Sequence, residues 1–304
     1  MDILYFPKRR TILSSQSLLR LLLLALLPFS VQALELSWVG CGITRNAFMA
    51  DLAAAYELET GISINISGGG ATKGIRAIAA RQADIGGACR YTLKRNREEA
   101  GASMIPVAWD ALVVVVHKSN HLDSISLPQL RDLYLGKITN WSQLGGEDQP
   151  LELLIRKGKI SGVGYTLRKH LFESPEVEFK SEYEFPSSGP LEKAVEQNRN
   201  AIAVTGIASA HKRNFKILKL EGRDPSFENI RTGNYLLYRP LFLVLSKNSP
   251  NSREADRFIQ FALGPKGREI ISKNQVVPYF DGMLLLQKRL DEWKRFIRES
   301  LAKH

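Results

Sequence analysis

The sequence predicts an α/β protein built of two lobes, and two observations lead to this prediction. Short β-branched runs alternate with helical patterns along the chain, which is typical of α/β layering with largely parallel sheets. Two long apolar runs, at 105–117 and 239–245, flank a central block of the chain. A chain that leaves one lobe and returns later builds one discontinuous lobe, one inserted lobe and a cleft that can close by a hinge. We therefore place lobe 1 at 34–110 and 240–282, and lobe 2 at 111–239.

In the first third of the chain, apolar periodicity separates strands from helices. It predicts strands at 36–40, 62–67 and 83–87, and helices at 44–60 and 73–82. Gly61 follows the first helix, and glycine at this place ends helices because it adopts a left-handed backbone conformation without strain.

The rest of the chain continues the alternation. The run Val113 to Val116 is wholly β-branched, which indicates a buried strand. Ser126 and Gln129 stand in capping-box spacing at the start of a helix. We also expect strands at 151–156, 201–205 and 239–245, and helices at 165–172, 188–197, 252–262 and 266–273. The apolar pattern at 283–302 predicts an amphipathic helix, which either packs on the body or binds a partner.

The N-terminal residues have the pattern of a signal peptide. Lys8, Arg9 and Arg10 precede an apolar run at 18–27, and small residues end at Ala33. The alternative is a membrane anchor, but the run is shorter than the ~20 residues that span a bilayer. We expect cleavage near Ala33 and a periplasmic location.

The charge balance favours anionic partners. The 304 residues carry a net charge of +11, and removal of residues 1–33 leaves an excess of eight positive charges. Such a balance raises the local concentration of anions. The cations form no long block and no nucleic-acid motif is visible, so we expect no nucleic acid partner. The five histidines are scattered without paired spacing, so we expect no metal and no cofactor.

Four glycine-rich turns share one setting, namely a strand end followed by a helix start. They lie at 40–44, 68–74, 86–90 and 156–164. A helix N-terminus presents free N–H groups and a positive dipole end, so it attracts anions. Hydroxyl donors stand at Thr44, Thr72 and Ser161, and Arg156 could clamp an oxyanion through two parallel hydrogen bonds. The four turns together predict an oxyanion site.

Several motifs resemble the periplasmic phosphate-binding proteins of ABC transporters, from Leu36 to about Tyr279. One of the family's ligand turns is similar to Ala83-Asp84-Ile85-Gly86 with Cys89-Arg90, and the core of another is similar to Ser161-Gly162. The other matching stretches are Leu130-Arg131-Asp132-Leu133-Tyr134, Gly136-Lys137-Ile138-Thr139-Asn140-Trp141, Leu144-Gly145-Gly146, Asn229-Ile230-Arg231-Thr232-Gly233, Tyr238-Arg239-Pro240-Leu241 and Gly264-Pro265-Lys266-Gly267.

This resemblance implies a two-lobed periplasmic binding protein fold, with a ligand cleft between α/β lobes joined by two crossing strands. It implies capture of phosphate or a similar oxyanion, delivery to the membrane permease of an ABC transporter, and a monomer. The residues on the implied ligand loops are Thr44, Ala71, Thr72, Cys89, Arg90, Arg156, Ser161 and Gly162.

The chain departs from the family pattern at these loops. Cys89 stands where relatives carry Asp or Ser, and Ala71 replaces a hydroxyl. The acid usual before Ser-Gly is absent. An acceptor carboxylate suits a protonated oxyanion such as hydrogen phosphate, so its loss weakens the phosphate assignment specifically. The added cations either face the ligand or point into water at the cleft rim; they are Arg45, Lys73 and Lys159.

Three functions were weighed. The first is phosphate delivery to a transporter. The second is a related binding module for pyrophosphate, a phosphonate or sulfate in sensing or regulation. The third is an enzyme, which would need a base beside a nucleophile or a metal cluster. No histidine neighbours Cys41 or Cys89 in sequence, so we expect no catalytic residue and no enzymatic activity.

The two cysteines, Cys41 and Cys89, follow the first and third predicted strands. In a lobe of this family those strands are neighbours, about 4.8 Å apart, within the Cα separation that a disulfide spans. An oxidising compartment favours the bridge. The alternative is two buried free thiols that act as small apolar residues.

Overall fold

The computed structural model describes residues 34–93, 95–246, 248–288 and 290. The predicted signal peptide and its cleavage point before residue 34 lie outside the described residues. The predicted C-terminal helix does begin at Met283 and continues through residue 288, and its part from 291 onward also lies outside them. Among the described residues, no helix combines the length and the apolar character needed to cross a bilayer.

One mixed sheet runs through the body, in the order β2-β1-β3-β11-β4-β8-β6-β7, with β12 and β9 paired to β4. A small second sheet joins β10 to β5. The strands are β1 Glu35–Gly40, β2 Ser63–Gly68, β3 Ile85–Ala88, β4 Ser103–His117, β5 Ser124–Ile125, β6 Glu152–Arg156, β7 Tyr183–Phe185, β8 Ala201–Gly206, β9 Phe215–Ile217, β10 Lys219–Leu220, β11 Tyr238–Leu245 and β12 Val277–Pro278.

Parallel pairing is confined to the ends of this sheet. β1 pairs in parallel with β2 and β3, and β6 pairs in parallel with β7 and β8. The strands between them are antiparallel, because β4 and β11 run in opposite directions across the middle. The sheets were predicted to be largely parallel, so the observed order is more mixed. Strands that connect two lobes need not follow the βαβ rule that makes each lobe parallel.

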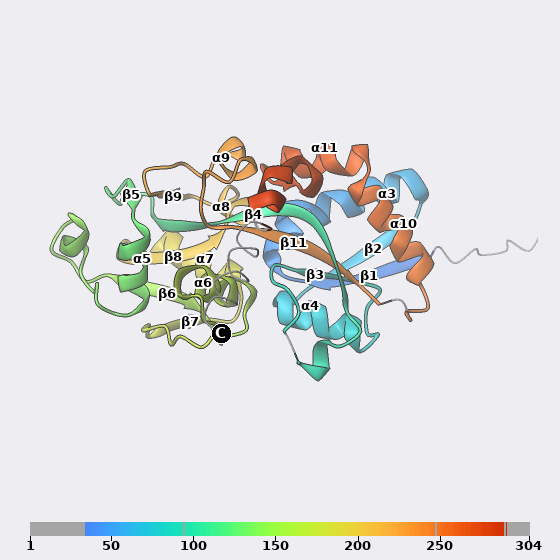
Figure 1. Ribbon diagram of the computed structural model, residues 1–304, viewed down its shortest axis with the longest axis horizontal. Coiled ribbons are helices and arrows are strands. Elements are labelled where there is room, and N and C mark those ends of the chain that lie inside the picture. The colour runs from blue at the N-terminus through green and yellow to red at the C-terminus, as the bar shows by residue number, and fades with distance from the viewer. Residues whose placement is uncertain (1–33, 94, 247, 289, 291–304) are drawn as a thin grey trace, which may run out of the picture. The chain divides into compact units, whose positions relative to one another are not determined.

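The strands β4 and β11 are the two that cross between the lobes (Figure 1). The first part of β4 pairs with β11, and its second part pairs with β8. Within the crossing pair, Asp110 lies opposite Arg239, and the register shifts between Leu241 and Phe242. The two residues at the predicted lobe boundaries, Asp110 and Arg239, therefore face each other at the crossing.

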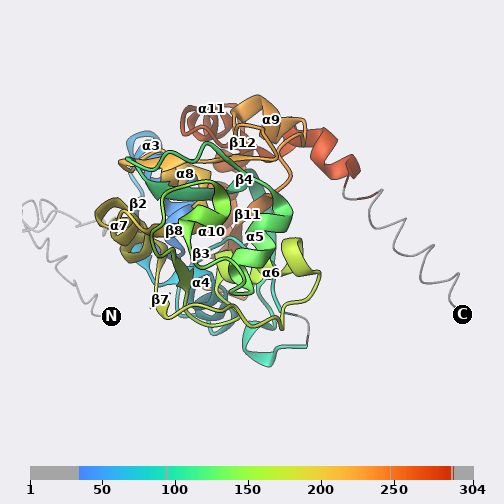
Figure 2. The ribbon, with the colours of Figure 1, turned by 90° about the vertical axis from the view of Figure 1, so that its left-hand side faces the viewer.

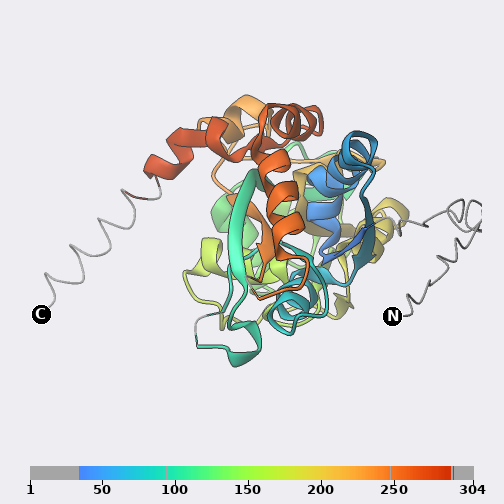
Figure 3. The ribbon, with the colours of Figure 1, turned by 90° about the vertical axis from the view of Figure 1, so that its right-hand side faces the viewer.

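Helices cover both faces of the sheet. In the first lobe α4 packs on β1 and β3, while α3 and α10 lie side by side over the other face (Figures 1 and 3). In the second lobe α6 and α7 both pack on β8, and Figure 2 shows them on opposite sides of it. The helices are α2 Gly42–Thr44, α3 Ala50–Thr60, α4 Gly70–Ala79, α5 Leu127–Tyr134, α6 Gly162–Phe172, α7 Ser188–Gln197, α8 Ile207–Ala210, α9 Phe227–Arg231, α10 Ser252–Leu263 and α11 Pro265–Lys273.

Short helical turns of other types complete the fold. η1 is a π-helical segment that joins α2 to α3 into one continuous helix, as predicted, apart from this change of pitch. Gly61 caps α3 in the left-handed conformation, and Ser126 and Gln129 form both bonds of a capping box on α5. The η segments are η1 Arg45–Met49, η2 Arg97–Glu99, η3 Trp141–Leu144 and η4 Tyr279–Gly282.

Candidate functional site

The ligand segments of the first lobe meet at the carboxyl ends of β1 and β3. Gly40 pairs with Gly87 in the parallel register, so Cys41 and Cys89 follow at the same edge of the sheet. The indole of Trp38 fills the space beside both glycines, and a Cβ atom at either position would overlap it. Glycine is therefore required here to bring the two strand ends close together.

The second-lobe loop closes directly onto this edge. A Cβ atom at Gly162 would overlap Cys89 Sγ and lie 3.1 Å from Ala71 Cβ. Thr72 Oγ1 donates to Ile160 O at 3.1 Å, and Arg90 Nε donates to the same oxygen at 2.9 Å. The predicted ligand loops of the two lobes are thus in contact.

Arg90, a predicted ligand, is held by a carboxylate that the sequence analysis did not find. Its Nη2 and Nη1 donate to Glu99 Oε1 at 2.6 Å and Oε2 at 2.9 Å, and both side chains are almost fully buried. Burial alone would raise the pKa of Glu99, but the bonds from Arg90 and from the Leu93 N–H hold it below its usual range. The charge of Arg90 is therefore neutralised within its own lobe.

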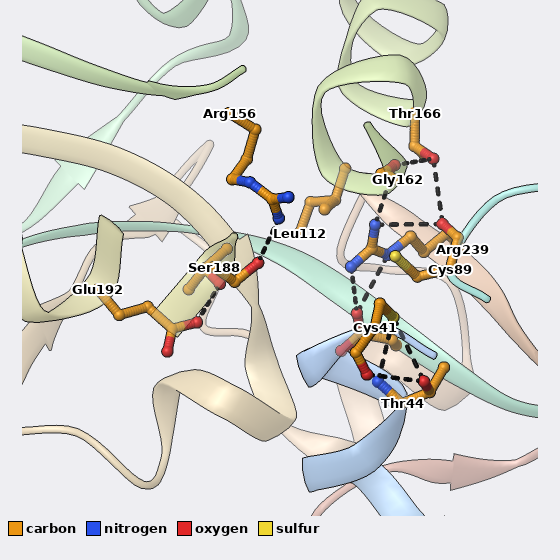
Figure 4. A network of polar contacts seen from close by, with 12 residues as sticks. Cys41, Thr44, Cys89, Leu112, Arg156, Gly162, Thr166, Ser188, Glu192 and Arg239 are labelled. Atoms are coloured by element: carbon orange, nitrogen blue, oxygen red, sulfur yellow. Dashed lines mark hydrogen bonds and ion pairs between the residues drawn. The ribbon is translucent and has the colours of Figure 1, made fainter. Parts of the chain in front are cut away.

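Arg156 has neutral partners. Its guanidinium donates to Ser188 Oγ at 2.9 Å, Pro186 O at 2.9 Å and Phe185 O at 3.3 Å (Figure 4). Within the described part of the chain, no carboxylate lies at ion-pair distance from it, although the residue is only 8% exposed. Burial lowers the pKa of Arg156 from its usual value. A buried positive charge of this kind is a favourable place for an anion.

Ser161 carries an unused donor on the same loop. It is the residue before α6, yet its side chain makes no capping bond. In the described structure its Oγ atom is buried and has no hydrogen-bond partner. Because buried hydroxyls are nearly always bonded, the Ser161 hydroxyl is a candidate donor for a bound anion.

Cys41 and Cys89 are both free and buried, and the predicted disulfide between them is not formed in this structure. Cys41 Sγ accepts from the Thr44 N–H at 3.4 Å and lies 3.3 Å from Thr44 Oγ1, which itself donates to Cys41 O. Burial would raise the pKa of Cys41, but a hydrogen bond with Cys89 and the bonds from Thr44 lower it to about 6. The same bond to Cys41, together with burial, raises the pKa of Cys89.

Arg239 is the central residue that sequence reasoning did not assign to the site. It pairs with Asp110 at 2.9 Å, and its Nη1 donates to Cys89 O at 3.3 Å and to Gly162 O at 3.4 Å (Figure 4). One buried guanidinium on a crossing strand thus touches the ligand loops of both lobes. A charge inside an otherwise apolar strand was the signal that could have identified it.

The three additional cations differ in their surroundings. Arg45 and Lys73 are exposed. Lys159 was considered as a cation for the ligand, but its Nζ pairs with Glu178 at 2.7 Å and Glu176 at 3.4 Å. These carboxylates follow it by fewer than twenty residues and draw it to the surface. No cluster of metal-binding side chains occurs in the described residues.

A cavity of about 730 Å³ opens beside the ligand loops. Both lobes line it, through Cys89 to Leu93 on one side and Lys159, Ile160, Tyr165 and Thr166 on the other, and Arg239 also contributes to its wall. Arg156 and Ser161 are not among the lining residues. A volume of this size is typical of small-molecule sites.

A family model described as the PBP superfamily domain matches residues 42–266. The chain belongs to this superfamily. This PBP-superfamily chain is 25% identical over 273 residues to the phosphate-binding protein PstS of Pseudomonas aeruginosa strain PAO1, across 80% of the chain and 83% of that protein.

Two solved structures resemble this PBP-superfamily protein. A putative phosphate ABC transporter substrate-binding protein with bound phosphate from Clostridium perfringens has a TM-score of 0.71 and 27% identity, over 80% of this chain and 99% of that one. An ABC-type phosphate transport receptor from Vibrio cholerae has a TM-score of 0.62 and 25% identity, over 80% and 99%. The fold is the two-lobed binding protein fold, as predicted.

Proposed function

We propose that this protein captures phosphate outside the cytoplasm and delivers it to the membrane permease of an ABC transporter. The observation that carries the proposal is a pair of groups on one loop: the buried Arg156 guanidinium, which has only neutral hydrogen-bond partners, and the Ser161 hydroxyl, which has no partner among the described residues. The relatives named as phosphate-binding proteins support phosphate as the anion.

The proposed binding event begins with separation of the two lobes. Phosphate enters against the start of α6, where Arg156, Ser161 and the Gly162 N–H supply charge and donors. Thr44, Thr72, Arg90 and the backbone from Ala71 and Cys89 then close over it from the first lobe. Lobe 1 at 34–110 and 240–282 and lobe 2 at 111–239 are the bodies proposed to move, about β4 and β11.

A second ligand class follows from the missing acceptor. Glu99 is bound to Arg90 and its pKa is low, so it offers no free acceptor for the proton of hydrogen phosphate. Another oxyanion without a proton, such as sulfate, remains the alternative ligand in a sensing or regulatory role. We propose that the protein binds its ligand without catalysing a reaction. It is proposed to do so in the periplasm, as a monomer without a cofactor.

Calorimetric titration of the purified mature protein with phosphate, sulfate, pyrophosphate and a simple phosphonate tests the ligand. We expect saturable binding of one phosphate per chain, with weaker binding of the other three anions. Tighter binding of sulfate than of phosphate would favour the alternative ligand, an oxyanion without a proton. Absence of binding by all four anions would contradict an oxyanion site.

A further inference from the structure

We propose that the reduced thiols of Cys41 and Cys89 form a covalent binding site for trivalent arsenic, taken up as arsenite. The inference shares the ligand loops of the proposed function and rests on the same opening of the lobes to admit an oxyacid. It differs in the residues that hold the ligand, because the two sulfur atoms replace the hydroxyl and guanidinium donors.

The two thiols are brought together by the sheet. Each cysteine follows a strand of the parallel pair β1 and β3, whose last aligned residues are Gly40 and Gly87. Both are free, and they are only 4% and 2% exposed. They lie at the centre of the ligand loops, where Gly162 of the second lobe packs against Cys89 Sγ and Arg239 lies beside both residues (Figure 4).

The chemistry of a thiol pair fits a thiophilic ligand better than phosphate. An S–H group is a weak hydrogen-bond donor, so two thiols add little to the recognition of phosphate oxygens. Thiolates are soft ligands that form strong bonds to soft centres. Trivalent arsenic is such a centre, and it is also carried by a small oxyacid of a size that a phosphate-type cleft admits.

The binding step needs no oxidant or reductant. Each cysteine sulfur attacks the arsenic of As(OH)₃, so two As–S bonds form and two As–O bonds break. The two thiol protons leave with the two displaced hydroxides as two water molecules. The product is a cyclic dithioarsenite that keeps one hydroxyl on arsenic, and neither arsenic nor sulfur changes oxidation state.

The surroundings favour this step. The thiolate is the nucleophile in thiol chemistry, and the Cys41 thiol is the one stabilised in ionised form by Thr44 and Cys89. Because Gly162 covers Cys89, arsenite must enter while the loops are apart. Arsenate, which resembles phosphate in shape, holds arsenic in the pentavalent state and forms no such dithiol adduct.

Arsenite titration of the full mature protein, reduced and free of phosphate, tests the proposal. Trp38 lies against Gly40 and Gly87, which end the aligned parts of the two strands before the thiols, so a fluorescence change that is lost in Trp38→Phe would report events there. We expect one arsenite per chain, loss of both countable thiols, and recovery of both on addition of a competing small dithiol. Arsenate should leave both thiols countable.

Substitution of each thiol separates chelation from incidental reaction. Cys41→Ser and Cys89→Ser should each weaken arsenite binding by about a hundredfold or more, because the second bond is formed at the high effective concentration of a linked site. Wild-type protein oxidised to the disulfide provides a second test that does not depend on folding of a variant, and it should take up no arsenite.

The outcomes distinguish this proposal from the phosphate proposal. Two countable thiols after arsenite, or undiminished arsenite binding in Cys41→Ser, would overturn the dithiol site. Phosphate binding in the same reduced sample would leave the proposed function standing in that case. Arsenite capture without phosphate binding would instead support the dithiol site and contradict the phosphate assignment.

Discussion

The two lobes differ in the partners of the polar side chains that they contribute to the candidate site. On the first lobe, Arg90 is bound by Glu99, and the Thr44 hydroxyl is bound by Cys41 O. On the second lobe, Arg156 has neutral partners and the Ser161 hydroxyl has none in the described structure. Both sides are buried, so solvent does not explain the difference.

This contrast assigns different tasks to the two lobes. In the first lobe, the Arg90 guanidinium and the Thr44 hydroxyl are bound within the lobe, which leaves shape, backbone groups and two thiols for a ligand. The second lobe retains buried donors without an acceptor of matching charge, so the electrostatic attraction of an anion comes from that side. We therefore propose that an anion binds first to the second-lobe loop and is then covered by the first lobe.

The largest effect is expected for stability, at the first-lobe pair. Glu99→Gln should lower the free energy of unfolding by about 3–5 kcal/mol, because it leaves the buried Arg90 guanidinium without its counter-charge. Urea unfolding measures this loss. The matched control is Glu98→Gln, since Glu98 pairs with Arg76 in a more exposed position and should cost about 0–1 kcal/mol. Equal losses of unfolding free energy in Glu99→Gln and Glu98→Gln would show that the buried pair of Arg90 and Glu99 contributes no special stability.

The same pair predicts a pH dependence. The fold lowers the pKa of Glu99, so its ionised form stabilises the protein fully above the unfolded pKa of about 4.3. That contribution is lost as the pH falls through the lower folded pKa. The free energy of unfolding of the wild type should therefore fall more steeply with decreasing pH below about 4.3 than that of Glu99→Gln. Superimposable pH profiles of the two proteins would contradict this prediction.

The next effect is expected for affinity, at the second lobe. Arg156→Ala should weaken phosphate binding by roughly 2–5 kcal/mol, because a desolvated charge pair with the ligand is lost. Calorimetry measures the change, and thermal unfolding without phosphate shows whether the variant is folded. Lys157→Ala is the control, since this neighbouring cation is exposed and should leave the affinity almost unchanged. Unaltered affinity in Arg156→Ala would remove Arg156 from the site.

A disulfide between Cys41 and Cys89 would affect the first lobe alone. Where no arsenite is bound, we expect oxidising conditions to close the bridge, which removes the dithiol site and stabilises that lobe by about 2–4 kcal/mol, as the closure of a long loop in the unfolded chain predicts. Thiol counting on the unfolded, unreduced protein checks it. Two free thiols per chain from a periplasmic preparation would end the prediction.

The smallest effect is expected at Ser161. Ser161→Ala should weaken phosphate binding by about 0.5–1.5 kcal/mol, the usual contribution of one hydrogen bond. It should not reduce stability, because the hydroxyl has no partner in the described structure. A loss of stability with unchanged affinity, measured by unfolding and calorimetry, would show that the hydroxyl has a structural role instead.

Local patterns in the sequence identified most of the regular elements, because periodicity and caps are short-range. The predicted helix at 188–197 and the long strand ending at His117 are both present. Errors occurred where glycine begins a helix. α4 begins at Gly70 instead of 73, and α6 at Gly162 instead of 165.

The partners of the site residues could not be predicted in the same way. Glu99 and Glu98 are adjacent and chemically alike, and only the fold decides which of them reaches Arg90 and which remains nearer the surface. The role of Arg239 depends on the crossing of β4 and β11, which brings together residues far apart in the chain. Pairing across such distances is a property of topology and has no local pattern.

The shared strand β4 also governs how the protein comes apart. Its first part completes the sheet of one lobe and its second part completes the sheet of the other, without a break between them. A cut at residue 111 would divide β4 into two shorter strands, the first paired with β11 and the second with β8. Because the lobes share this strand, we expect them to unfold as one cooperative unit, and calorimetric melting should show a single transition instead of two.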